Sequence, residues 1–145
     1  MKPRINVLTL AVDNLEKAHA FYRDGLGLPS QGILGTEFKG DAKTPAGTVA
    51  FFELQGGLIF ALYPRTELAK DANRPTAAPS STEFSLGYAV NSKKEVDALL
   101  ARAKQAGAVV TEPPHDRPWG IYSGYFQDLD GHLWEVIWNP GLTVE

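Results

Sequence analysis

The order of strand and helix signals repeats once along this chain, and that repeat limits what the chain can fold into. Residues 10–14 end a strand-like segment at an asparagine that can cap a helix, and residues 88–92 end a second one at a serine about 78 residues later. An internal duplication explains the match most economically. The alternative is a generic α+β domain with a chance similarity.

The first half of the chain reads as strand, helix and three strands. Alternating β-forming residues predict the first strand, and apolar residues at helical spacing after Asp13-Asn14 predict the helix. The expected strands are residues 5–12, near 35–38, 48–54 and 58–63, and the expected helix is 15–23. The glycines at 56 and 57 predict a hairpin turn between the last two strands.

The second half repeats that order after a proline-containing linker. Ser92 and Glu95 have the spacing of a capping box, which predicts the start of a helix ended by Gly107. The expected strands are residues 84–90, one that begins over 108–111, 122–127 and 133–138. A loop is expected over 113–120 and a turn over 128–131. We therefore predict one α+β domain over 1–145, with module one at 3–64, a linker at 65–82 that holds a helical turn near 67–70, and module two at 83–141.

Composition excludes several classes of site and favours a soluble protein. The absence of cysteine rules out disulfides, zinc–thiolate sites and a cysteine nucleophile. A net charge of −3 with mixed signs gives no basic footprint for nucleic acid or a membrane surface. No apolar stretch has the length of a bilayer span or the form of a signal peptide. We expect a cytoplasmic protein without nucleic-acid or membrane partners.

Two long motifs carry a resemblance to a known family. Residues 123–136, SGYFQDLDGHLWEV, combine an aromatic strand, a D-x-D-G turn and a strand that bears Glu135, and residues 10–28 end in F-Y-x-x-x-L-G-L. Both resemble the glyoxalase/bleomycin resistance/dioxygenase (vicinal oxygen chelate) superfamily, and Pro118-Trp119-Gly120 also fits it. The resemblance implies two βαβββ modules that form curled mixed sheets. We interpret Asp128, Asp130 and His132 as turn residues rather than metal ligands.

The resemblance also implies four positions that hold a metal ion in the metal-dependent members. They fall on Val7, Ala61, Ser85 and Glu135, of which only Glu135 can ligate well. His115, the histidine best able to approach, would raise the count only to two ligands. We therefore expect no metal and no cofactor, as in the drug-binding members of the bleomycin-resistance type.

Other side chains are candidates to line a ligand pocket. Strand alternation turns the small residues Val7 and Ser85 towards it, together with Glu135, and the resemblance implies the same for Ala61. Trp119 lies outside any core periodicity and would stack on an aromatic ligand or, equally, anchor its loop. Tyr122 and Tyr125 fall on opposite faces of one strand, so one of them would face the pocket. Phe38 and Phe52 are the first-half candidates of lower rank, with Phe51 beside them.

Glu135 separates the functional alternatives. An inward carboxylate needs a partner, so it would bind a donor on a ligand, serve as a general base in catalysis, or make a structural contact. We predict a metal-independent small-molecule binding protein, with an aromatic antibiotic as one ligand class. The alternative is a glyoxalase-like lyase or isomerase, or a dioxygenase, with an atypical metal site, or a metal-free acid/base enzyme that uses Glu135. The resemblance also implies a homodimer.

Overall fold

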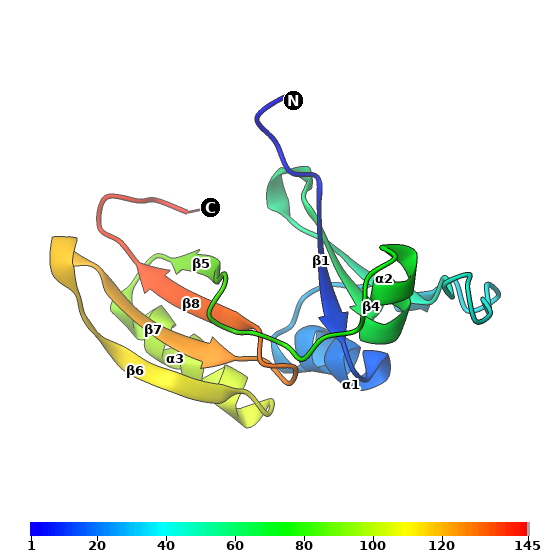
Figure 1. Cartoon of the computed structure of the whole chain (residues 1–145). Helices are drawn as coiled ribbons and strands as arrows, with labels where there is room; N and C mark the ends of the chain where they lie inside the picture. The colour runs from blue at the N-terminus through cyan, green and yellow to red at the C-terminus, as the bar shows by residue number, and fades with distance from the viewer. Residues whose placement is uncertain (145) are drawn as a thin grey trace. The chain divides into compact units, whose positions relative to one another are not determined.

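The computed structural model describes residues 1–144, whose contacts gather into two compact units, Met1–Ala78 and a second unit from Pro79 onward (Figure 1). Each unit is described by itself. None of the helices in the described residues combines the length and apolarity needed to cross a bilayer.

The first unit is a four-stranded mixed sheet with a helix on one face. Its elements are β1 (Val7–Val12), α1 (Leu15–Ala20) with a π-helical turn (Phe21–Gly25), β2 (Ile33–Leu34), β3 (Val49–Glu53), β4 (Ile59–Pro64) and α2 (Arg65–Asp71). The strand order is β1-β4-β3-β2, with β1 parallel to β4 and the other pairs antiparallel. The α2 helix confirms the helical turn predicted near residues 67–70.

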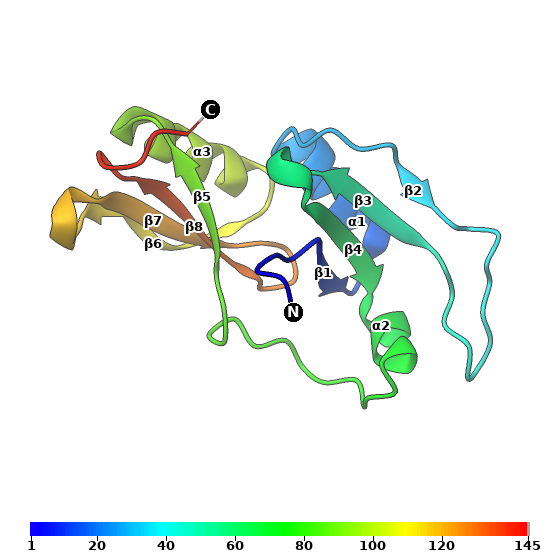
Figure 2. The ribbon, with the colours of Figure 1, turned by 90° about the horizontal axis from the view of Figure 1, so that it is seen from above.

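The second unit repeats this topology (Figure 2). Its elements are β5 (Leu86–Val90), α3 (Lys93–Gln105), β6 (Val109–Asp116), β7 (Tyr122–Gln127) and β8 (Leu133–Trp138). The order is β5-β8-β7-β6, with β5 parallel to β8. Two sheets of the same order confirm the predicted α+β fold of two βαβββ modules. The sheets are not closed.

Side-chain caps begin the main helices of both units, as the sequence predicts. The Asn14 side chain accepts a hydrogen bond from the amide of Lys17 at 2.9 Å, and the Ser92 hydroxyl accepts one from the amide of Glu95 at 3.2 Å. The carboxylate of Glu95 reaches the amide of Asn91 at 2.7 Å, one residue before the cap. These bonds satisfy amides that the first helical turn leaves free.

Each core lies between one sheet face and the unit's own helix. In the first unit Phe52 and Phe60, both 1% exposed, contact the ring of Tyr22 in the π-helical turn that follows α1. In the second unit Val136 and Phe126 are buried on the face that α3 covers. The alternation of strands then sends the next residues to the opposite, open face.

The structure corrects the predicted strand near residues 35–38. The strand is Ile33–Leu34, and Gly35 turns the chain with φ of +76° while its carbonyl accepts from the amide of Phe38. A Cβ at Gly35 would lie 2.2 Å from the carbonyl oxygen of Gly47, so only glycine fits there. Phe38 consequently lies in a turn and is 62% exposed.

The structure also corrects the predicted loop over residues 113–120. Strand β6 continues to Asp116, and its pairing with β7 shifts register between Val110 and Glu112 and again between Glu112 and His115. These irregularities lie on an edge strand, and Pro113 and Pro114, which have no amide to donate, fall between the paired residues Glu112 and His115. Prolines that favour a loop are thus accommodated by bulges.

We predict unequal costs for truncating two neighbouring phenylalanines of β3. Phe52→Ala should lower the free energy of unfolding by about 3–5 kcal/mol, because it opens a cavity beneath α1. Phe51→Ala removes the same atoms from a side chain that is 39% exposed on the open face, and should cost no more than about 1.5 kcal/mol. Urea unfolding followed by circular dichroism measures both, and equal losses would contradict this assignment of faces.

Candidate functional site

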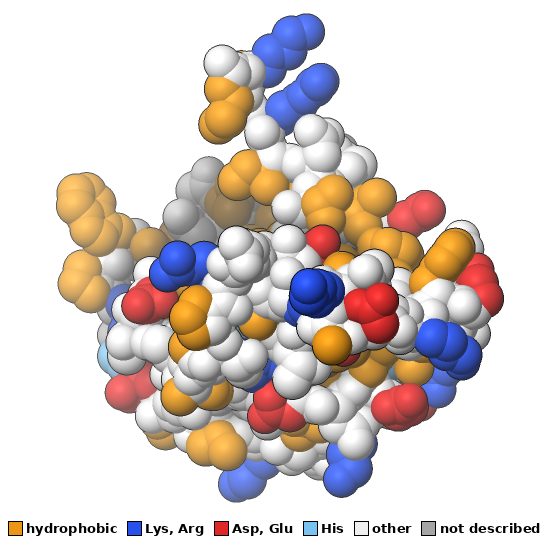
Figure 3. All heavy atoms as spheres, turned by 45° about the vertical axis from the view of Figure 1, so that its right-hand side comes forward, with side chains coloured by type: hydrophobic (Ala, Val, Ile, Leu, Met, Phe, Trp, Pro, Cys, Tyr) orange, Lys and Arg blue, Asp and Glu red, His pale blue; other side chains and the backbone are white. Residues whose placement is uncertain are grey.

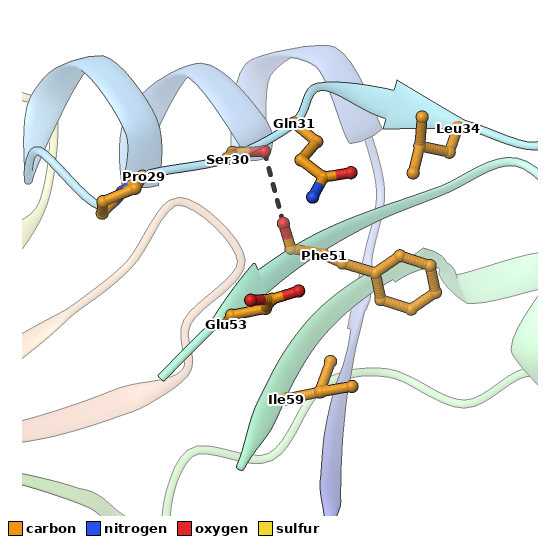
Figure 4. Close-up of a pocket in the computed structure, with 7 residues that line it drawn as sticks. All are labelled: Pro29, Ser30, Gln31, Leu34, Phe51, Glu53 and Ile59. Carbon is orange, nitrogen blue, oxygen red and sulfur yellow. Dashed lines mark hydrogen bonds between the residues drawn. The ribbon is translucent and has the colours of Figure 1, made fainter. Parts of the chain in front are cut away.

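The open face of the first sheet carries a hollow of about 430 Å³ (Figure 4). Its lining comes from β3, β4 and the segment that contains β2: Pro29, Ser30, Gln31, Leu34, Phe51, Glu53 and Ile59. The Ser30 hydroxyl donates to the carbonyl oxygen of Phe51 at 3.3 Å and accepts from the amide of Gly32 at 3.0 Å. The bond to Phe51 holds the segment against β3, and the bond from Gly32 fixes the turn of the segment itself, so the side chain of Ser30 orders this rim of the hollow.

His19 supports this rim from the core side. Its Nε2 lies 2.8 Å from Ser30 Oγ, and its ring lies 5.7 Å from that of Phe52. Burial, and then the charge of Arg23, lower the pKa of His19 below its ordinary value. The imidazole is therefore neutral at neutral pH and acts as a structural partner of Ser30.

The open face of the second sheet carries a polar cluster centred on Glu135. The buried hydroxyl of Ser123 donates to Glu135 Oε1 at 2.8 Å, and Tyr125, opposite Glu135 in the ladder, hydrogen-bonds to the same carboxylate. Arg117 donates from Nε to the carbonyl oxygen of Ser123 at 3.3 Å, and its guanidinium lies 5.3 Å from the centre of the Tyr125 ring. The structure thus gives Glu135 two donors from strand β7.

Burial is the main cause that raises the pKa of Tyr125 above its ordinary value, followed by the hydrogen bond to Glu135 and its negative charge. Arg117 acts in the opposite direction. The phenol therefore stays neutral through the physiological range and remains a donor to the carboxylate.

A second hollow, of about 470 Å³, lies beside this cluster. Its lining is Thr82, Phe84, Ser85, Thr111, Glu112, Arg117, Tyr125 and Leu133. Ser85 and Tyr125 were expected there from strand alternation. Arg117 was missed because the predicted loop over 113–120 gave its side chain no direction. Thr111 and Glu112, at and just after the end of the predicted strand 108–111, were missed as well.

The remaining first-module candidates lie in different settings. Val7 is on the open face and 49% exposed, and Ala61, 2% exposed, points to the same face as its partners in the ladder, Thr9 and Phe51. Phe52 faces the core beneath α1, contrary to the expectation that it lines a pocket, because its neighbour Phe51 takes the open side of β3. Phe38 lies outside the residues that line the hollow of its unit.

Tyr122 is also a correction, because it faces the helix side. Its hydroxyl donates to Asp97 on α3 at 2.7 Å, and the Lys93 ammonium lies 5.2 Å from its ring centre. The hydrogen bond to Asp97 is the main cause that raises its pKa. Of the two tyrosines on β7, Tyr125 is the one on the open face.

Trp119 lies in the turn between β6 and β7, is 92% exposed, and has a φ of +70°. A non-glycine residue rarely adopts this left-handed conformation. Its exposure excludes the alternative that it anchors its loop on the sheet in this conformation.

The face drawn in Figure 3 shows side chains of both charge signs interspersed with hydrophobic ones.

The histidines of the second unit have local partners. His115 lies on β6, where its Nδ1 is 2.9 Å from the carbonyl oxygen of Asp116 and its Nε2 is 3.5 Å from Glu112. Asp128 accepts from the amides of Asp130 and His132 at 2.9 and 2.8 Å, and its other oxygen lies 2.7 Å from His132 Nδ1. The D-x-D-G residues are structural, as the sequence indicates.

The residues present do not fit the divalent ion that the family resemblance implies. Val7 and Ala61 have no donor atom in their side chains, and a serine hydroxyl is a poor ligand at the position of Ser85. Across residues 1–144 no three or more His, Cys, Asp or Glu side chains are grouped to hold a metal ion. Glu135 instead accepts hydrogen bonds from protein donors.

Comparisons with known proteins agree with the fold. The family model described as Glyoxalase/Bleomycin resistance protein/Dioxygenase superfamily matches residues 4–136. A glyoxalase-related enzyme structure from Fulvimarina pelagi is 24% identical, with 99% of this chain and 93% of that chain covered and a TM-score of 0.81. A lactoylglutathione lyase structure from Agrobacterium tumefaciens is 27% identical over 100% of both chains, with a TM-score of 0.68. A genomically encoded fosfomycin resistance protein from Listeria monocytogenes is 23% identical over 96% of this chain and 95% of that one, with a TM-score of 0.66. No curated protein matches the sequence.

We predict that Glu135→Gln lowers the pKa of Tyr125 towards its ordinary value of about 10. The substitution removes the negative charge that disfavours the phenolate and weakens the acceptor of its hydrogen bond. Tyrosinate absorbance titration gives the value, with a Tyr125→Phe difference spectrum to isolate this residue. An unshifted titration would show that the two side chains do not interact.

Proposed function

This chain belongs to the glyoxalase/bleomycin resistance protein/dioxygenase superfamily, and we propose that it binds a small organic molecule without a metal ion. The four positions that hold a metal ion in metal-dependent members carry Val7, Ala61, Ser85 and Glu135 in this chain. The observation that carries the proposal is the set of hydrogen-bond partners of Glu135. Its carboxylate is held by Ser123 and Tyr125 next to a hollow of about 470 Å³. Hollows of this size are typical of small-molecule sites.

The chemistry of the two hollows favours a ligand with a flat apolar part. Phe84 and Leu133 line one hollow, and Phe51 and Ile59 line the other. Trp119, two residues after Arg117 in the chain, adds an exposed indole ring. Aromatic antibiotics are one class of such ligands, and one structural relative is a fosfomycin resistance protein.

A metal-free acid/base enzyme is the second candidate, favoured by the fixed orientation of Glu135. A carboxylate with both a hydroxyl and a phenol as partners can take and return a proton from a bound substrate. The 27% identity to a lactoylglutathione lyase supports an enzyme of lyase or isomerase type as this alternative. Turnover of a ligand that the protein binds separates the enzyme from the binding protein. The homodimer and the cytoplasmic location stay predictions.

We predict that binding does not depend on metal. A panel of aromatic molecules titrated against protein treated with a chelator should contain ligands that quench tryptophan fluorescence. Their affinity should change by less than about twofold when Zn²⁺, Ni²⁺, Mn²⁺ or Fe²⁺ is restored, because residues 1–144 contain no group of three suitable ligands to hold the ion. Stoichiometric metal in the purified protein, together with binding that needs it, would overturn the proposal.

We predict that Trp119→Gly separates ligand contact from stability. Glycine adopts a φ of +70° without strain, so the free energy of unfolding should stay the same or rise by up to about 1 kcal/mol. Quenching by an aromatic ligand should fall at least threefold in amplitude, whereas Trp119→Phe, which keeps an aromatic ring, should keep the affinity. A glycine variant that binds as tightly as the parent would remove Trp119 from the site.

A further inference from the structure

Arg117 lines the second hollow and has an unused hydrogen-bonding group. Its Nε donates to the carbonyl oxygen of Ser123, but its Nη2 is buried and has no hydrogen-bond partner among the described residues. A buried donor on a charged group is costly when it stays unpaired. The cost disappears when a ligand supplies an acceptor.

No carboxylate within residues 1–144 forms an ion pair with this guanidinium. Glu112 also lines the hollow, but its carboxylate lies 3.5 Å from His115 Nε2. Glu135 is bonded to Ser123. Arg117 is therefore held by a backbone carbonyl and an aromatic ring, and its positive charge is not neutralised by a direct partner.

The orientation of Arg117 is fixed before any ligand arrives. The guanidinium carbon lies over the ring of Tyr125, 5.3 Å from the ring centre, and the hydrogen bond from Nε to the carbonyl oxygen of Ser123 holds the group from a second direction. A guanidinium held in this way presents its remaining donors in its own plane. That arrangement suits a planar acceptor with two oxygens.

Other residues of the hollow suggest the rest of the ligand. Thr82, Ser85 and Thr111 offer hydroxyl donors, and Phe84 and Leu133 offer apolar surface. Phe84 is 47% exposed, so its ring is accessible from solvent. The hollow thus combines one cation, neutral donors and an apolar wall.

We propose that Arg117 is an anion-binding residue and that the ligand of this protein carries a carboxylate joined to a flat apolar body. This inference rests on the proposed binding function and narrows its ligand class. The carboxylate pairs with the donors of Arg117 at the plane of the guanidinium, and the apolar body lies towards Phe84 and Leu133. The protein's net charge of −3 would not by itself predict an acidic ligand. A cation in direct contact with the ligand, however, outweighs charges that lie farther away.

Two probes of the same shape test the proposal, 2-naphthoate and its neutral counterpart 2-naphthamide. Titration calorimetry gives both affinities, and amide shifts in proton–nitrogen correlation spectra locate binding at Ser85, Thr111 and Tyr125. We expect the parent protein to bind the carboxylate at least about tenfold more tightly than the amide, the range of a charge-assisted hydrogen bond.

Variants of Arg117 assign the preference to this side chain. Arg117→Gln should weaken 2-naphthoate at least about tenfold and leave 2-naphthamide within twofold, and Arg117→Lys should fall between, because an ammonium lacks the planar fork. Arg74→Gln removes the same charge from an exposed site in the first unit and should change neither affinity. The comparison of the two probes on the parent protein stands even where a variant fails to fold.

The outcomes separate this inference from the proposed function. Equal affinity for the two probes, unchanged 2-naphthoate binding in Arg117→Gln, or no shifts in the hollow with either probe would each overturn the inference. Metal-free binding of neutral aromatic molecules from the panel would then leave the proposed function intact. Loss of all aromatic binding in chelator-treated protein would overturn both.

Discussion

Each sheet of this chain buries only one face under its own helix, and everything at the candidate site depends on that one-sided burial. The period of two in a strand divides its residues between a helix-covered face and an open one. Phe52 and Val136 belong to the covered faces, and their neighbours Phe51 and Glu135 belong to the open ones. A slip of one residue in either sheet would exchange core and site. Burial of apolar side chains fixes the register of each strand in the core. It therefore also fixes which side chains lie on the open face.

The duplicated topology does not duplicate the chemistry. The corresponding strands β4 and β8 place Ala61 and Glu135 at the family's ligand positions, so the first open face is apolar where the second is charged. In the first unit the hydrogen bonds of the hollow are made by Ser30 with backbone groups of Phe51 and Gly32. In the second unit the hydroxyl of Ser123 bonds to the side chain of Glu135, and Arg117 bonds to the carbonyl oxygen of Ser123. The fold supplies two equivalent platforms, and residue choice places a hydrogen-bonded carboxylate at the family position of the second one.

The sequence predicts most of the fold and part of the site, for identifiable physical reasons. Strong alternation and a D-x-D-G turn define β7 and β8 to the residue, and the same alternation correctly turns Glu135 to the open side. The prolines of β6 conceal an edge strand, because bulges absorb residues that would break a regular ladder. That error hides Arg117, whose side chain has no direction until β6 is traced to Asp116. Phe52 and Tyr122 show a second limit of prediction from sequence. When both faces of a strand carry aromatic residues, the pattern of the strand alone does not reveal which face the helix covers.

Glu135 shows how a carboxylate at a family ligand position can be held by hydrogen-bond donors of the protein itself. A carboxylate on a half-covered face needs donors, and in a metal site the ion and its other ligands would meet that need. Here Ser123 and Tyr125 meet it from the adjacent strand, and Arg117 is tied to the same strand through the carbonyl of Ser123. The cation and the carboxylate are thus held apart, each with its own protein partners, instead of neutralising each other in an ion pair. Their separation leaves the positive group with an unused donor, and this donor is the physical basis of the proposed anion-binding site.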